Sequence, residues 1–485
     1  MCDRKSDVFI VPKKFCQHKQ NGGKGDTFHR FGEETTVQTR RADNMVSGTA
    51  GINYRIQKAN RTDGRVQNLA VLIDKQALMR VHNRMKTDKA SGTDKVTKEE
   101  YAVNLESNLE NLINRLKEEK YRPKPSRRVY IPKDGSQKMR PLGISCYEDK
   151  LVENVIAEIL IPIYETKFIN TSYGFRPNRN CHMAVREIIE MVQYRKTNYV
   201  VEADIKGFFD NVNHEWLMKM LEYDIADRRF LKIIERFLKA GIMENGKYVD
   251  TERGTPQGNG ASPVLANIYL HHILDLWFEI AVKKKMKGQC YLIRYADDFV
   301  CCFEKKHEAE IFMELLKRRF GKFGLELAEE KTKLLEFGRF AKGNRERRGE
   351  GKPETFDFLG FTFYCGQANK DGFFRCRVKT SKKKFRSKLK AMKEWIKSNR
   401  HMRLKDLFKT LSSKLRGHYQ YYGVTDNTNA IQSFYHLTKK LLYKWLNRRS
   451  QKRSYNSEGF NSLLKTFGLP APKIYVSLFY RRVTI

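Results

Sequence analysis

The sequence predicts an α+β fold in which an antiparallel sheet near the middle of the chain is flanked by helical regions. Two hydrophobic runs rich in β-branched and aromatic residues, at 199–205 and 291–303, end at or enclose acidic residues. Apolar residues recur at helical spacing before these runs, and long helix-like stretches follow them. The chain has 485 residues, of which 40% are hydrophobic, so it is long enough for about three domains.

The N-terminal part of the chain divides into a polar arm and a helical region. The first 54 residues are polar and show no useful periodicity, which is typical of a flexible arm or of a segment that orders on RNA. The segment 66–116 predicts helices separated by a loop at 91–94. Its apolar residues at three-to-four spacing are Leu69, Leu72, Ile73, Ala77, Leu105, Leu109, Leu112, Ile113 and Leu116.

A β-hairpin with a basic tip is predicted next. Residues 127–133 alternate and are rich in β-forming side chains, and Asp134 and Gly135 supply a turn signal before 138–143. A helix is expected at 149–164.

The acidic residues lie at the ends of the predicted central strands. The run 199–205 reads as a buried strand that reaches Asp204. The runs 291–295 and 299–303 read as two strands joined by a turn that contains Asp297 and Asp298.

The C-terminal part is predicted to be mainly α-helical. The basic run 342–352 looks like an exposed linker or loop. Helices are expected at 382–397, 404–422 and 431–449. The resulting division is an arm at 1–60, a mixed region at 61–355 and a C-terminal region at 356–485.

The charge of the chain indicates a polyanionic partner. Lys and Arg number 94 against 56 Asp and Glu, which gives a net charge of +38. The 23 Tyr and 30 Phe can stack on unpaired bases while the cations follow phosphates. A generally solvated basic surface is the alternative, but the mixture favours RNA or single-stranded nucleic acid.

Other classes of protein are disfavoured. The nine cysteines form no Cys-x-x-Cys pair and no zinc-type cluster, so we expect reduced thiols in a cytoplasmic protein. No run approaches the roughly 18 apolar residues of a membrane helix. We therefore expect a soluble protein with no membrane contact.

The three aspartates have the chemistry of a two-metal centre. Nucleotidyl transfer requires several carboxylates that hold two divalent cations about 3.5 to 4 Å apart. Asp204 lies 93 residues before Asp297, so this centre would require a tertiary contact. The alternative is that Asp297 and Asp298 form an ordinary hairpin turn.

The surrounding motifs resemble those of reverse transcriptases. Three occur in the family's order: Asp-Ile-Lys-Gly-Phe-Phe-Asp at 204–210, Gly-Thr-Pro-Gln-Gly with Ser-Pro at 254–263, and Tyr-Ala-Asp-Asp at 295–298. Further segments resemble bacterial group II intron reverse transcriptase/maturases, from about residue 60 to the end. They are Tyr-Gly-Phe-Arg-Pro at 173–177, Leu-Ala-Asn-Ile-Tyr-Leu at 265–270, Phe-Leu-Gly-Phe at 358–361 and Leu-Arg-Gly-His-Tyr-Gln-Tyr-Tyr at 415–422.

The resemblance implies a right-hand polymerase with fingers, a palm built on the antiparallel sheet, and an α-helical thumb or maturase domain. It implies two Mg²⁺ ions, for which Mn²⁺ could substitute, held by Asp204, the Ile205 carbonyl, Asp297 and Asp298. The implied dNTP-binding residues are Lys133, Arg140, Phe209 as a steric gate, and Gln257. The implied primer and template residues are Tyr295, Lys331, Phe358, Leu359 and Gly360.

Some of these residues have simpler interpretations. Phe209 and the tract 358–361 could be plain core. Lys133 and Arg140 could contact an RNA backbone instead of a triphosphate.

Two features depart from the family pattern. The family usually has a second glycine and two apolar residues after Gln-Gly, whereas this chain has Asn259, Gly260 and Ala261. Since asparagine tolerates a left-handed backbone, we expect the turn to survive, with altered support of the templating base. The sequence to Ile485 also carries no H-N-H endonuclease signature, so we expect no cleavage of a second DNA strand.

The C-terminal region carries the candidate RNA-binding residues. Its basic side chains fall on a pattern that could line one side of a helix, with a solvated face as the alternative. The candidates are Lys382, Lys383, Lys390 and Arg416.

These observations leave three functional hypotheses. The first is an RNA-directed DNA polymerase that copies intron RNA from a DNA primer or target and assists splicing, in the cytoplasm and at the bacterial nucleoid. The second is a catalytically silent RNA-binding splicing factor. The third is a host-adapted reverse transcriptase in repair or defence.

Overall fold

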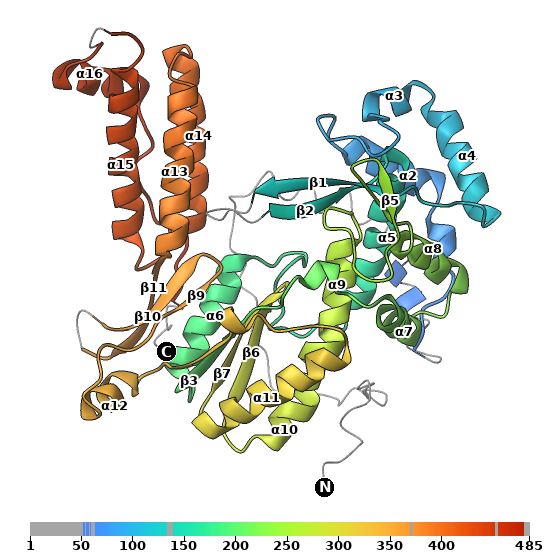
Figure 1. Cartoon of the computed structure of the whole chain (residues 1–485), viewed down its shortest axis with the longest axis horizontal. Helices are drawn as coiled ribbons and strands as arrows, with labels where there is room; N and C mark the ends of the chain where they lie inside the picture. Colours follow the sequence, from blue (N-terminus) through green and yellow to red (C-terminus); the bar gives the residue numbers. More distant parts are fainter. Residues whose placement is uncertain are drawn as a thin grey trace, which may run out of the picture.

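The computed structural model describes residues 52–53, 55–57, 59, 64–132, 139–368, 372–451 and 454–479. These residues form three β-sheets surrounded by helices (Figure 1). The predicted mixture of helices and antiparallel strands is confirmed at this level. No helix in the described ranges is long and apolar enough to cross a membrane.

The central sheet has the strand order β6-β7-β3-β8, with every pair antiparallel. Its strands are β3 (Tyr199–Ala203), β6 (Cys290–Tyr295), β7 (Asp298–Phe303) and β8 (Lys333–Glu336). The predicted strand-turn-strand unit is thus the β6–β7 hairpin, in which Tyr295 pairs with Asp298.

The central sheet is buried on both faces because its side chains alternate between two hydrophobic cores. Val201 and Cys301 belong to the core that includes α11 (Lys306–Lys322). Val200 and Cys302 belong to the second core, which includes α6 (Cys181–Tyr194) and the C-terminal helices. The central sheet therefore contributes side chains to both hydrophobic cores of the molecule.

The N-terminal half contains the predicted hairpin. Its strands are β1 (Ser126–Pro132) and β2 (Met139–Ile144), and β1 also pairs with a small hairpin that the sequence did not predict, β4 (Ile242–Glu244) and β5 (Lys247–Val249). The surrounding helices are α2 (Lys75–Arg84), α3 (Lys98–Val103), α4 (Leu105–Lys117), α5 (Tyr147–Glu165), α7 (His214–Asp224) and α8 (Arg228–Leu238). The predicted helix at 149–164 is α5.

A long helical segment runs beneath the central sheet. It begins with α9 (Ser262–Leu270), continues through the π-helical turns η4 (His271–Asp275) and η5 (Phe278–Val282), and ends with α10 (Lys283–Lys285). Almost every residue of α9 is buried, which explains its nearly uniform apolar composition. Short 3-10 turns lie at Ala70–Leu72, Phe208–Asp210 and Glu329–Lys331.

The C-terminal half combines a small sheet with helices, so the expectation of a mainly helical region from 356 onward missed three strands. The strands are β9 (Phe356–Phe358), β10 (Phe361–Gln367) and β11 (Phe374–Thr380). The helices are α13 (Lys382–Ser398), α14 (Leu404–Tyr422), α15 (Thr428–Leu446) and α16 (Ser457–Phe467). Alternating apolar residues in β9 and β10 pack on the second core. The strands are too short for this alternation to give a clear strand signal in the sequence.

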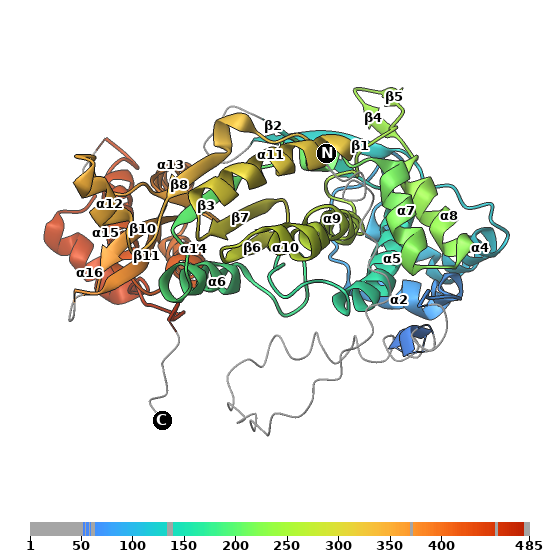
Figure 2. The same ribbon diagram turned by 90° about the horizontal axis from the view of Figure 1, so that it is seen from below.

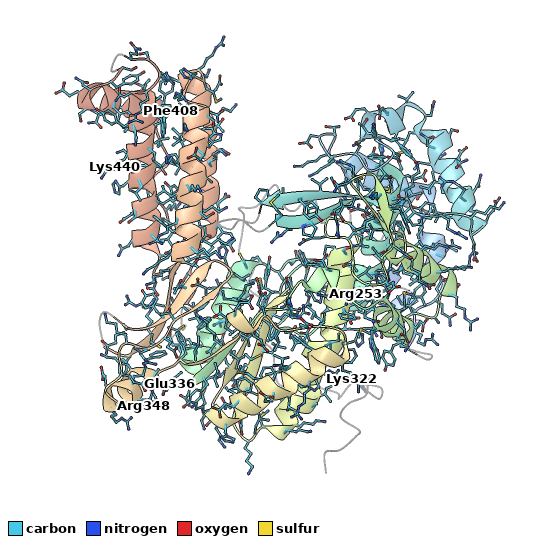
Figure 3. All side chains as sticks on the ribbon, viewed as in Figure 1. Arg253, Lys322, Glu336, Arg348, Phe408 and Lys440 are labelled. Carbon is cyan, nitrogen blue, oxygen red and sulfur yellow. The ribbon has the colours of Figure 1, made fainter. Side chains whose placement is uncertain are left out.

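The basic run at 342–352 is not simply a loop. Residues Ala341–Arg347 form α12, and Arg348 pairs with Glu336 at the end of β8 (Figure 3). Asn344 also donates to Glu336, at 2.7 Å. Local ion pairs thus order a segment whose composition alone indicated a linker.

The helices α13, α14 and α15 stand together as a helical column on one side of the central sheet (Figure 1). The β1–β2 hairpin extends toward this column from the other side, above the central sheet. Figure 2 shows α6 and α11 on opposite faces of that sheet. The ends of β3, β6 and β7 therefore lie between two projecting elements.

Candidate active site and nucleic-acid cleft

The three aspartates meet because the strands that carry them are neighbours. Asp204 directly follows β3, whose last residue, Ala203, pairs with Phe299 of β7. Asp298 is the first residue of β7. In this antiparallel arrangement the end of β3 and the start of β7 share one edge of the sheet. The tertiary contact that the spacing could not reveal is present.

The carboxyl groups affect each other's protonation. Burial raises the pKa of Asp298 to about 7, and the charges of Asp297 and Asp204 add to this effect. Burial, followed by Asp204, also raises the pKa of Asp297, while the Arg140 charge opposes the rise. Such mutual repulsion is relieved when cations bind between the carboxylates.

Lys331 is a positive group that contacts this cluster. Its Nζ pairs with Oδ2 of Asp204, and this hydrogen bond raises the pKa of Lys331. Lys331 ends the 3-10 turn Glu329–Lys331, where Ala328 donates its N–H to the Asp204 carbonyl at 2.9 Å. The segment that carries Lys331 is thereby fixed to the end of β3.

Carboxylate oxygens are suitable ligands for Mg²⁺. Among the described residues, however, no three His, Cys, Asp or Glu side chains are arranged to enclose a metal ion. The carboxylate oxygens and the raised pKa values of Asp297 and Asp298 fit a divalent cation. The side-chain conformations of these aspartates do not themselves form a complete ligand set. Ile205 is buried and pairs with Leu327 in an isolated bridge.

A buried arginine, which the sequence reasoning overlooked, supports the Asp297 turn. Arg294 and Asp275 are both fully buried and form two hydrogen bonds, of 2.7 and 2.6 Å. Arg294 Nη1 also donates to Asn267 Oδ1 and to the Ala296 carbonyl, each at 2.9 Å. Ala296 has a φ of 58°, so this contact holds a left-handed residue directly before Asp297.

A close backbone approach confines the same turn. A Cβ atom on Gly174 would lie 2.2 Å from the Ala296 nitrogen, and Asn267 donates to the Gly174 carbonyl at 2.7 Å. This contact explains why the segments 173–177 and 265–270 accompany the Asp-Asp motif, since both pack against its turn.

Phe209 lies on the 3-10 turn Phe208–Asp210, which follows Asp204 closely in the chain. Thr255 donates its N–H to the Phe209 carbonyl at 2.7 Å, which places the segment 254–258 against this turn. The ring of Phe209 is half-buried, whereas Phe208 is fully in the core, with 5.4 Å between their centroids. Phe209 therefore packs partly against the first core and keeps part of its surface exposed, whereas Phe208 does not.

Gln257 and Arg140 are connected through β2. Gly143 donates its N–H to the Gln257 carbonyl at 2.8 Å, and a Cβ on Gly258 would lie 2.9 Å from the Gly143 carbonyl oxygen. Arg140 is exposed on the same strand. The predicted Lys133 falls outside the described residues.

The structure corrects the expectation for Asn259. The left-handed position of the turn belongs to Gly258, with a φ of 114°, and Asn259 is not among the residues with positive φ. The Asn259 side chain is buried and makes hydrogen bonds instead. Periodicity and turn propensity could not reveal these tertiary contacts.

Two of the residues predicted to contact the primer, Leu359 and Gly360, line a cavity of about 710 Å³, referred to below as the cleft. Leu359 and Gly360, both with positive φ, form the tight turn between β9 and β10, and Tyr421 donates to the Leu359 carbonyl at 2.9 Å. Leu359, Gly360 and Asp298 all line the cleft. Phe358 is buried in the second core, and Tyr295 packs partly buried against it.

The far wall of the cleft comes from the helical column. It is basic and aromatic, formed by Lys384, Lys388, Trp395, Lys414, His418 and Tyr421 among others. Lys414 lies 5.0 Å above the Trp395 ring. The predicted RNA-binding residues Lys382, Lys383, Lys390 and Arg416 are exposed but do not line the cleft. Lys384 and Lys388 precede Met392 at four-residue spacing, so they share its helix face, which also carries Trp395. This spacing would have distinguished the lysines that line the cleft from those that do not.

Comparison with known proteins is consistent with this geometry. Residues 131–363 match the family model for reverse transcriptase (RNA-dependent DNA polymerase). Residues 382–460 match the model for the group II intron maturase-specific domain. The two matched regions are the one that contains the aspartates and the one that forms the helical column.

Individual relatives agree. The group II intron-encoded protein LtrA of Lactococcus lactis subsp. cremoris is 30% identical over 68% of this chain and 66% of its own length. Protein YkfC of Escherichia coli K12 is 34% identical over 50% of this chain and 71% of its own. A putative COX1/OXI3 intron 1 protein of Saccharomyces cerevisiae is 34% identical over 46% of this chain and 26% of its own. The chain thus spans just under two thirds of LtrA and belongs to the family of group II intron reverse transcriptases with a maturase domain.

Proposed function

We propose that the chain is an RNA-directed DNA polymerase that extends a DNA primer on an intron RNA template. The observation that carries this proposal is the convergence of Asp204, Asp297 and Asp298 at the edge of the cleft, next to Phe209 and within electrostatic reach of Arg140.

In this proposal the region 61–355 supplies the fingers and palm, and 356–485 supplies the primer grip and the thumb or maturase domain. The arm at 1–60 has no assigned role. The β1–β2 hairpin belongs to the fingers, the central sheet is the core of the palm, and the helical column is the thumb. This division follows the two hydrophobic cores only approximately, because both cores share the central sheet.

Each side chain has a proposed task. Asp204, Asp297 and Asp298, with the Ile205 carbonyl, hold two Mg²⁺ ions, which would activate the primer 3′-oxygen and stabilise the pyrophosphate. Lys133 and Arg140 contact the triphosphate, Gln257 lines the nucleotide site, and Phe209 excludes a ribose 2′-hydroxyl.

A second group of residues accounts for primer placement in this proposal. The turn at Leu359 and Gly360 holds the primer strand beside Asp298, and Tyr295 lies under its end. Lys331 neutralises part of the Asp204 charge. Lysines of the cleft follow the phosphates of the template and primer duplex.

A second role in splicing is proposed for the C-terminal region. The match of residues 382–460 to the maturase-specific domain favours assistance to intron RNA folding. The exposed Lys382, Lys383, Lys390 and Arg416, which do not line the cleft, are the candidates for this contact. A chain with only this role would be a splicing factor without polymerase activity.

The decisive experiment is extension of a DNA primer on an RNA template with Mg²⁺ and dNTPs. The native chain is compared with Asp297→Ala/Asp298→Ala at equal RNA occupancy, and with the exposed-site control Asp250→Ala. Extension that is lost only in the double variant supports the polymerase. Tight RNA binding without extension by any form supports the splicing factor. A host-adapted enzyme would extend primers but show no preference for intron RNA.

A further inference from the structure

The turn after Gln257 is built differently from the family pattern, and the structure reveals its support. Glu153 of α5 is 1% exposed, and its carboxylate meets this turn. Its Oε1 accepts from Asn259 Nδ2 at 2.6 Å, and its Oε2 accepts from the Gly260 N–H at 3.1 Å. Asn259 Oδ1 in turn accepts from the Ala261 N–H at 2.8 Å.

The same carboxylate also contacts the end of the hairpin. Ser145, directly after β2, donates its hydroxyl to Glu153 Oε1 at 2.6 Å. Upstream on β2, Gly143 donates to the Gln257 carbonyl at 2.8 Å. Glu153 therefore connects α5, the end of β2 and the Gln257 turn, because it accepts hydrogen bonds from three donors.

A buried carboxyl group is costly unless several donors satisfy it. Burial raises the pKa of Glu153 to about 8, and the hydrogen bonds from Ser145 and Gly260 oppose this rise. The packing leaves little tolerance, since a Cβ on Gly260 would lie 2.9 Å from Asn154 Nδ2. Asn259 is 8% exposed, and a glycine there would remove both the donor to Glu153 and the acceptor for Ala261. The hydrogen bond between Glu153 and Asn259 therefore supports this turn where the family pattern has a second glycine.

We propose that Glu153 is a positioning residue for the nucleotide site, which acts through Asn259 to set the place of Gln257 and hence selection of the incoming dNTP. This inference rests on the proposed role of Gln257. Glu153 itself touches no substrate, because it lies behind the turn in the core. Its effect is therefore on nucleotide affinity and pairing accuracy, not on the bond-forming step.

The test compares Glu153→Gln, Asn259→Gly and the double variant in steady-state extension. Glu153→Gln keeps the volume but presents an amide to at least one of three donors. In each single variant we expect the dNTP KM to rise about 5- to 10-fold and misincorporation to increase, with kcat within 2-fold. Because the two residues share the hydrogen bond from Asn259 to Glu153, the effects of the two substitutions should be less than additive in the double variant.

The matched control is Glu158→Gln, since Glu158 lies on the same helix but pairs with Arg80 and Arg84 near the surface. It should leave the dNTP KM and misincorporation unchanged. A lower Tm for Glu153→Gln, with dNTP KM and misincorporation within 2-fold of the native values, would show that Glu153 is only structural.

A binding readout separates this inference from the proposed activity. Amide hydrogen exchange at 256–261 is measured on the primer–template complex with and without dNTP. Protection by dNTP in the native chain that is lost in Glu153→Gln supports the positioning role even if no extension occurs. Equal protection in both forms, or none in the native chain, would overturn it.

Discussion

Arg294 donates a hydrogen bond from Nη1 to the carbonyl oxygen of Ala296, 2.9 Å away and one residue before the Asp-Asp pair. The guanidinium is held from behind by Asp275, so its direction is set by a buried ion pair. The position of the Asp297 turn therefore depends on a side chain that does not face the cleft.

Replacing the whole pair tests this dependence without leaving a buried charge. Arg294→Met/Asp275→Leu should remain folded, since apolar replacement of a buried ion pair is often neutral. The loss of the contact with Ala296 should lower kcat about 100-fold, because displacement of a reacting group by about 1 Å can cost this much. The measurements are Tm and single-turnover extension.

An ion pair with one buried member serves as its control. Asp224 is 2% exposed and pairs with Lys167 at 2.7 Å, on a different part of the core. Lys167→Met/Asp224→Leu should leave kcat unchanged. If both double variants lose activity equally, general loosening of the core explains the effect, not the Ala296 contact.

Lys331 should compete with cations for Asp204, because its ammonium pairs with the Asp204 carboxylate. Lys331→Met removes this charge, so half-maximal extension should require several-fold less Mg²⁺. Lys206 is the control, since it lies near the same strand end but pairs with Glu326 at 3.2 Å. A higher Mg²⁺ requirement in Lys331→Met would instead show that the lysine orients Asp204.

Phe209 and Phe208 should respond differently to truncation. Phe209→Ala opens the half-buried position beside the aspartates, so incorporation of ribonucleotides relative to dNTPs should rise at least 10-fold. Phe208→Ala should leave this ratio unchanged but destabilise the fold by about 3 to 5 kcal/mol, because Phe208 is buried in the core. Competition between rNTP and dNTP measures the first effect, and urea unfolding measures the second. Unchanged sugar selection in Phe209→Ala would remove the steric-gate assignment.

The cleft lysines should contribute more to duplex affinity than the other lysines of α13. Replacing Lys384, Lys388 and Lys414 with Gln should reduce the slope of log affinity against log salt by about 2 to 3. Replacing Lys382, Lys383 and Lys390 with Gln is the charge-matched control and should change it less. Equilibrium binding of a primer–template duplex at several salt concentrations distinguishes the two surfaces. The opposite ranking would move the duplex to the outer face of the helical column.

His418 should make stability depend on pH. It is stacked on Phe434 with 3.8 Å between ring centroids, and burial, aided by the Lys388 charge, lowers its pKa to about 4. The unfolded chain binds this proton near pH 6.5 whereas the folded chain does not, so stability is lost as pH falls below 6.5.

The His418 contribution should fall by about 2 kcal/mol between pH 7 and pH 5, from the difference between the folded and unfolded pKa values. Urea unfolding of the native chain and His418→Phe at both pH values measures it. The two proteins should differ in their pH dependence by this amount. Parallel pH profiles would mean that folded His418 is protonated normally.

The sequence by itself determined the elements and the chemistry of this protein. The hydrophobic runs at 199–205 and 291–303 and the apolar spacing of 404–422 specified strands and a helix, because these patterns are local. The order of the motifs indicated the family. Composition was less reliable, since it described 342–352 as a linker and overlooked strands after 356.

Only the tertiary structure decided which distant groups act together. Asp204 reaches Asp297 through strand pairing, and Arg294, Asp275 and Glu153 support the turns at 296–298 and 257–261 through contacts between residues up to 106 positions apart. Such partners carry no local signal, because a buried charge is compatible with the core only where folding brings donors to it. The same reason explains why the cleft is lined by Lys384, Lys388 and Lys414, since the packing of three helices selects which face of each is open.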